Sequence, residues 1–154
     1  MIETIKQVSV FLENKPGRLA KVLSALAKEK VNVTALTVMD SHEHSALRLV
    51  TGDPAKTVQV LNAHGFRHAE SDVLLVELKN QPGALAHVCE LLANDHINID
   101  YCYASSGGRN GKVFGVFKAT NLDRAKQLLG GTANNKRPER KPLRDKRIYS
   151  GPAR

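Results

Sequence analysis

Two stretches of the chain show the same pattern of apolar and polar positions, 66 residues apart. Residues 14–32 read NKPGRLAKVLSALAKEKVN and residues 80–98 read NQPGALAHVCELLANDHIN, with nine of nineteen positions identical and no gap. In both stretches the apolar residues recur at helical intervals: Leu19, Val22, Leu23 and Leu26 in the first, and Leu85, Val88, Cys89 and Leu92 in the second. This spacing places them on one stripe of a helix. The chain is therefore predicted to contain a duplicated unit.

The same order of elements is predicted in both copies. Short Val- and Leu-rich runs predict strands, and N-x-P-G between a strand and a helical pattern predicts a turn that opens the helix. The expected elements are strands at 6–12 and 72–78, helices at 16–29 and 82–95, strands at 31–39 and 97–104, polar turns at 40–44 and 105–111, strands at 45–51 and 112–119, and helices at 54–64 and 121–129. Asp53 before Pro54 is a typical helix N-cap, and Gly65 and Gly130 are expected to end the second helices.

The first copy continues into a plausible fourth strand at 66–71, whereas the second copy has no equivalent after Gly131. The expected class is α+β, a ferredoxin-like βαββαβ plan with an antiparallel sheet and two helices on one face. The predicted units are residues 1–71 and 72–131. One unit of this size makes a thin core, so the two are expected to pack together.

Charge is concentrated in the C-terminal tail. Residues 132–154 hold eight Lys and Arg and two acidic residues, which accounts for six of the chain's eight net positive charges. The tail is also rich in Pro and poor in apolar residues, so it is predicted to be disordered. The remainder is close to neutral, which argues against a basic nucleic-acid surface on the body.

A strand, then N-x-P-G-x-L-A, then a helix, then hydrophobic-Asn-hydrophobic resembles the ACT domain, twice over and across residues 2–131. The resemblance is greatest to small stand-alone tandem ACT proteins, which are similar to the regulatory ends of amino-acid biosynthetic enzymes. It implies a non-enzymatic regulatory protein that binds an amino acid at the interface between ACT units.

The residues themselves are compatible with such a ligand. A turn that opens a helix presents unpaired amides to a carboxylate, and Asn14 and Asn80 supply both a donor and an acceptor. In amino-acid-binding ACT domains, the loop amides and the two matching Asn positions contact the ligand. The resemblance therefore implies one site at Asn14, Lys15, Pro16, Gly17 and Asn32, and a second at Asn80, Gln81, Pro82, Gly83 and Asn98. Serine-binding members carry a His where Leu12 and Leu78 stand, so serine is not favoured over larger or apolar amino acids.

No catalytic motif, P-loop or dinucleotide fingerprint is present, and no cofactor is expected. The histidines at positions 42, 44, 64 and 68 are candidate metal ligands, but polar turn roles explain them better. Cys89 lies on an apolar helical stripe and is expected to pack in the core, while Cys102 lies in a strand between two tyrosines.

The preferred hypothesis is a cytoplasmic homodimeric amino-acid sensor, with an enzyme as a further expected partner. No signal peptide or membrane span is expected. One alternative is a regulatory subunit of an amino-acid biosynthetic enzyme such as acetolactate synthase. Another is an RNA-binding ferredoxin-like protein that uses the basic tail.

Overall fold

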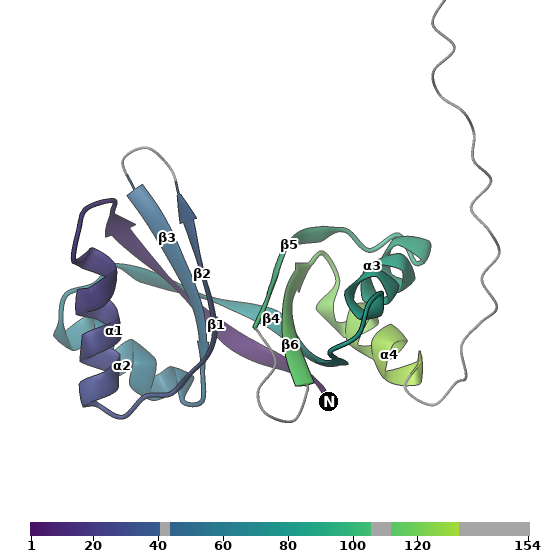
Figure 1. The fold of residues 1–154 in the computed structure, drawn as a ribbon, viewed down its shortest axis with the longest axis horizontal. Coiled ribbons are helices and arrows are strands. Elements are labelled where there is room, and N and C mark those ends of the chain that lie inside the picture. The colour runs from purple at the N-terminus through teal and green to yellow at the C-terminus, as the bar shows by residue number, and fades with distance from the viewer. Residues whose placement is uncertain (41–43, 106–111, 133–154) are drawn as a thin grey trace, which may run out of the picture.

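The computed structural model describes residues 1–40, 44–105 and 112–132, and it confirms the α+β class. Its elements follow the duplicated order (Figure 1). They are β1 (Ile2–Glu13), α1 (Arg18–Lys28), β2 (Val33–Asp40), β3 (His44–Thr51), α2 (Pro54–Ala63), β4 (His68–Lys79), α3 (Ala84–Asn94), β5 (Ile99–Ala104), β6 (Lys112–Ala119) and α4 (Leu122–Thr132). The predicted disorder of the tail concerns residues that are almost all outside the described ranges.

One antiparallel sheet runs through both halves of the molecule, in the order β2-β3-β1-β4-β6-β5. Its centre is a ladder between β1 and β4, in which Ile2 pairs with Val76 and Val10 pairs with His68. The start of β1 thus pairs with the second half of β4, and the start of β4 pairs with the second half of β1. Each of these long strands belongs to both halves of the sheet.

This sharing differs from the separate strands predicted at 66–71 and 72–78, because β4 continues through both ranges without a break. It also supplies the strand that the second copy lacks. Residues 2–6 of β1, extending upstream of the strand predicted at 6–12, pair with residues 72–76 and lie where a fourth strand would be. The boundary predicted between residues 71 and 72 falls inside β4.

A local twofold axis passes through the centre of the β1–β4 ladder. Lys6 and Asp72 are equivalent in the repeat, and they lie opposite each other in the register. Their side chains form an ion pair, with Lys6 Nζ 2.9 Å from Asp72 Oδ1. The two halves of the sheet are therefore related by a twofold rotation about an axis that passes close to this ion pair.

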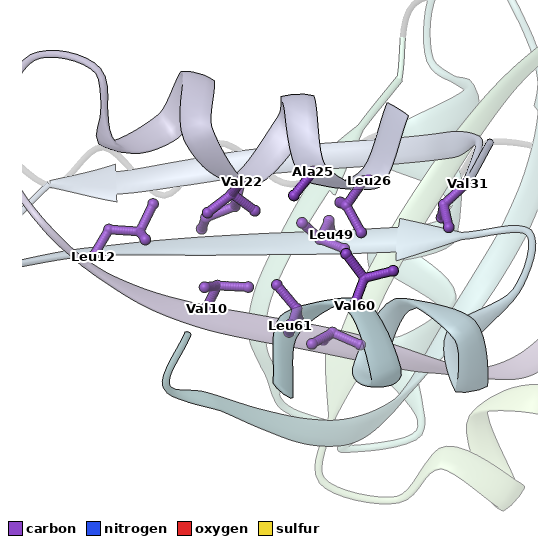
Figure 2. Close-up of a cluster of buried hydrophobic side chains, with 11 residues drawn as sticks. Val10, Leu12, Val22, Ala25, Leu26, Val31, Leu49, Val60 and Leu61 are labelled. Carbon is purple, nitrogen blue, oxygen red and sulfur yellow. The ribbon is translucent and has the colours of Figure 1, made fainter. Parts of the chain in front are cut away.

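The helices lie on the outer faces of the sheet, with α1 and α2 over one half and α3 and α4 over the other (Figure 1). Figure 2 shows the first core, where Val22 and Leu26 of α1 and Leu61 of α2 reach the buried strand residues Val10 and Leu49. The second half has the equivalent core around Leu74, Leu92 and Phe117. In the described part of the chain, no helix is long and apolar enough to cross a membrane.

A third core lies on the helix-free face of the sheet and joins the halves. It contains Ala35 and Val50 from the first half and Val73, Leu75 and Val116 from the second. β2 also contacts β5, which is the opposite edge of the same sheet. The two edges of the twisted sheet therefore approach each other over this third core.

Three helix ends depart from the prediction. Both α1 and α3 begin two residues late, because the glycine of N-x-P-G is the N-cap and adopts a left-handed conformation, with φ of 83° at Gly17 and 84° at Gly83. Proline therefore lies before the helix and not in its first turn. α4 runs on through Gly130 to Thr132. The predicted cap of α2 is confirmed, since Asp53 Oδ1 accepts a 2.9 Å hydrogen bond from the Lys56 amide.

Candidate functional site

The two N-x-P-G turns are exposed loops that connect the central strands to the helices. The first, Asn14–Gly17, follows β1, and the second, Asn80–Gly83, follows β4. All eight of these residues are exposed. The sequence thus placed both candidate turns correctly between a strand and a helix, and neither turn is packed shut.

The two turns have the same backbone structure. In the first, the Lys15 amide donates to the Glu13 carbonyl at 2.9 Å and the Arg18 amide to the Lys15 carbonyl at 3.3 Å; the second repeats both bonds from Gln81 and Ala84 at the same distances, 2.9 and 3.3 Å. The N-cap residue of each helix is a glycine, which has no side chain with which to cap the first turn. First-turn amides without a capping side chain give each turn a partial positive charge that suits a carboxylate.

Glycine is required at the end of each turn for its backbone conformation. A Cβ atom at Gly17 or Gly83 would meet no atom within 4 Å, so the space beside each glycine is open. The positive φ angle is the constraint, because side chains with a Cβ are strained there. The turns therefore combine an accessible backbone with a fixed shape.

The charges around the two turns differ. At the first, Glu13 Oε2 lies 3.0 Å from both Lys15 Nζ and Arg18 Nη2. Hydrogen bonds from Lys15 and then Arg18 lower the pKa of the Glu13 carboxyl. The equivalents at the second turn are Lys79, Gln81 and Ala84, which cannot form this cluster. The two turns therefore share a backbone structure but differ in the charges around it.

The second asparagine of each predicted site lies at the far end of the helix. α1 and α3 each have 11 residues, or about 16 Å of helix, and Asn32 and Asn98 follow their C-terminal ends. Both are exposed, and their carbonyls accept 3.1 Å hydrogen bonds from the amides of Gly52 and Thr120. The Asn98 side chain donates to Asp100 Oδ1 at 3.0 Å. Neither asparagine meets the turn of its own half.

The two turns also lie at opposite ends of the β1–β4 ladder. Eight residues separate Ile2 from Val10, the outermost paired positions of β1. The turns lie beyond both ends, so they are more than about 25 Å apart along the strands. A single site built from both turns of one chain does not form.

Sequence reasoning missed a buried polar cluster on the helix-free face. Gln7 is fully buried, and its Nε2 donates to Tyr101 Oη at 2.8 Å and to Ser9 Oγ at 3.3 Å. Its Oε1 accepts from Tyr103 Oη at 2.9 Å. The Arg48 guanidinium lies 3.8 Å from the centre of the Tyr101 ring. A signal existed, because Gln7 is a polar residue where the repeat has the apolar Val73.

Metal ligands do not gather in the described part of the chain, where no group of three or more His, Cys, Asp or Glu is found. His42 is outside the described residues. His68 Nδ1 is instead 2.9 Å from the carbonyl oxygen of Phe66, which fits the polar role expected for it.

A groove of about 220 Å³ lies between α1 and α2, away from both turns. Glu29 and Lys56 line it, with no ion pair between them among the described residues. In the second half, Asp95, the repeat equivalent of Glu29, forms a bidentate bridge with Arg124 of α4, which donates to it at 2.6 and 2.9 Å. The hydrogen bonds from Arg124 lower the pKa of Asp95.

Comparison with known proteins gives a consistent assignment. The model of the ACT domain pair matches residues 3–135. The structure of protein BT0572 from Bacteroides thetaiotaomicron is similar at a TM-score of 0.78 with 33% identity, over 86% of this chain and 90% of that one. No curated protein matches the sequence.

The fold also occurs in regulatory subunits of aspartate kinase. The ligand-free subunit from Thermus thermophilus is similar at a TM-score of 0.62 with 14% identity, over 84% of this chain and 93% of that one. The subunit from Thermus flavus gives a TM-score of 0.59 with 17% identity, over 86% and 95%. At these identities the likeness concerns the fold.

Proposed function

Because this chain belongs to the ACT domain pair family, we propose that it is a non-enzymatic regulatory sensor that binds an amino acid at its two N-x-P-G turns. The observation that carries the proposal is the pair of exposed helix starts without a side-chain cap, each closed by a left-handed glycine. The amides of each turn would hold the carboxylate of the ligand. Asn14 or Asn80 would contact its polar groups.

A complete site would need a second copy of the chain. Asn32 and Asn98 lie one helix length away from the turns of their own halves, so we propose that each joins a turn of a second chain. We therefore place the ligand between two copies, in a homodimer. Binding there would favour the paired state, and a partner enzyme that reads this state would be regulated.

Isothermal titration of the full chain with each of the twenty amino acids tests this proposal. Heat is expected with at least one of them, and Asn14→Ala with Asn80→Ala should weaken binding about tenfold or more through the lost hydrogen bonds. The matched control is Asn62→Ala, an exposed asparagine on α2 away from both turns. If no amino acid gives heat, or if Asn62→Ala weakens binding equally, the turns are not the site.

The role of regulatory subunit remains the second candidate, since the aspartate kinase regulatory subunits share this fold. Capture of a biosynthetic enzyme on the immobilised chain, released by the bound amino acid, would support it. An RNA-binding role for the sheet is disfavoured. Such sheets stack bases on exposed aromatics, whereas here Tyr101 and Tyr103 are tied to the buried Gln7 on the helix-free face.

A further inference from the structure

The two cysteines of the chain occupy matching places in the repeat. The sequence contains only Cys89 and Cys102. Their equivalents 66 residues earlier are Leu23 on α1 and Leu36 on β2, so a leucine pair in the first half is a cysteine pair in the second. One substitution falls on the helix α3 and the other on the edge strand β5 of the same half.

Both cysteines lie on the helix-covered side of the second half. Cys89 lies on α3 and is half-buried against the cluster that contains Phe117. Cys102 lies on the edge strand β5, directly opposite Phe117 in the antiparallel register. Residues opposite each other in such a pair point to the same face of the sheet. Because Phe117 points into the core beneath α3, Cys102 lies on the face that α3 covers.

The two thiols differ in their surroundings. Burial raises the pKa of the Cys89 thiol, and the charge of Cys102 raises it further. Cys102 is exposed at the edge of the sheet, so a small oxidant can reach it. The pair thus combines one accessible thiol with one partly covered thiol.

We propose that Cys89 and Cys102 are a redox-active pair that closes to an intrachain disulfide when a small disulfide oxidant, such as glutathione disulfide, is present. The Cys102 thiolate attacks one sulfur of the oxidant and releases one small thiolate. The Cys89 thiolate then attacks Cys102 in this mixed disulfide and releases the second. The protein loses two protons and two electrons, and the oxidant is reduced to two small thiols. The bond joins α3 to the edge of the sheet.

The order of attack follows from exposure and thiolate character. Thiolates are the attacking species, and the raised pKa of Cys89 keeps more of it protonated. Cys102 is therefore the thiol that meets the oxidant, and Cys89 is the resolving thiol. The first half, with leucines at both positions, cannot form such a bond.

Oxidation of the reduced full chain with glutathione disulfide tests the pair. Both thiols should be lost together, the intact mass should fall by two hydrogens, and the chain should stay uncrosslinked to other copies. Digestion must cut between the cysteines, because trypsin leaves both in residues 80–109; cleavage after Glu90 separates them. The expected product is two peptides joined until a reductant is added.

Two variants assign the roles and control for misfolding. Cys89→Ser should trap glutathione on Cys102, because the resolving thiol is absent, while Cys102→Ser should react much more slowly at Cys89. Both should keep the far-ultraviolet circular dichroism spectrum of the parent chain. Stable mixed disulfides on both cysteines of the parent chain, a disulfide between two chains, or a Cys89 that never reacts would each overturn the inference.

Discussion

The buried Gln7 cluster makes a sharp test of what joins the two halves. Gln7 of β1 hydrogen-bonds Tyr101 and Tyr103 of β5, which belong to opposite halves of the repeat. Replacing Gln7→Leu keeps the volume similar but removes three hydrogen bonds at once. The two tyrosine hydroxyls and the Ser9 hydroxyl then lose their partner on the helix-free face.

The expected cost follows from the burial of the groups that are left. An unsatisfied buried polar group costs about 1–3 kcal/mol. Both tyrosines are half-buried and can regain some water, so their contribution falls at the lower end, whereas Ser9 is buried. We therefore expect Gln7→Leu to lower the free energy of unfolding by about 2 kcal/mol. That is a large share of the roughly 5–15 kcal/mol that holds a domain folded.

Urea unfolding, followed by far-ultraviolet circular dichroism, measures this change. Gln127→Leu on α4 is the matched control, because it makes the same substitution at an exposed position and should change stability by less than about 0.5 kcal/mol. Tyr103→Phe alone should cost about 1 kcal/mol, since it leaves Gln7 Oε1 unpaired.

A double-mutant cycle decides whether the cluster acts as a unit. The double variant Gln7→Leu with Tyr103→Phe lacks both partners of one hydrogen bond. The loss in its free energy of unfolding should therefore be about 1 kcal/mol smaller than the sum of the losses in the two single variants. The reasoning is refuted if the two costs simply add, or if Gln7→Leu is as neutral as Gln127→Leu. In either case apolar packing alone would hold the helix-free face together.

Four further outcomes are expected. Gly17→Ala and Gly83→Ala should each cost about 1–2 kcal/mol because of their positive φ angles, and a cost below that of Gly52→Ala, an unstrained control, would contradict this. Gly115→Ala should cost about 1–3 kcal/mol through overpacking, since its Cβ would lie 2.7 Å from Phe117 Cε2; an unchanged Tm would contradict it. Burial holds the pKa of Tyr103 above its ordinary value, so the unfolded chain releases this proton first. Stability should be intact below about pH 10 and fall above it, and Tyr103→Phe should remove that part of the fall in urea titrations at increasing pH. Lys6→Asp should destabilise by placing like charges opposite each other, and adding Asp72→Lys should restore stability; failure of the second change to rescue the first would show that the ion pair at the axis is unimportant.

Local chemistry was enough to predict most elements of the fold. The Asp53-Pro54 cap specifies the start of α2, and the apolar stripe of Leu19, Val22 and Leu26 specifies α1 and, by repetition, α3. These signals act within a few residues, so they are readable in one dimension. The helix starts were misplaced by two residues because Pro before Gly fits either a first turn or a left-handed cap, and only the backbone angle distinguishes them.

The strand exchange could not be read in this way. The strand that completes the second half comes from residues 2–6, about seventy positions before the segment that it pairs with. No local pattern encodes such a partner, because pairing across this separation depends on the whole fold. The arrangement of the candidate site could not be predicted for the same reason. The sequence identified both turns and all four asparagines, but their spacing along the chain did not reveal that each helix holds the turn and the second asparagine apart.

Fusion of two equivalent units in one chain also permits differences that a pair of identical chains could not have. At the local twofold axis, identical chains would place Lys against Lys or Asp against Asp, whereas here Lys6 meets Asp72. Gln7 is likewise buried opposite two tyrosines, while its equivalent Val73 lies in an apolar core. The turns follow the same rule, with a Glu13, Lys15 and Arg18 cluster at one and Lys79 at the other. Since their backbones match and their charges differ, the two turns that we propose as ligand sites should differ in affinity for any one zwitterion.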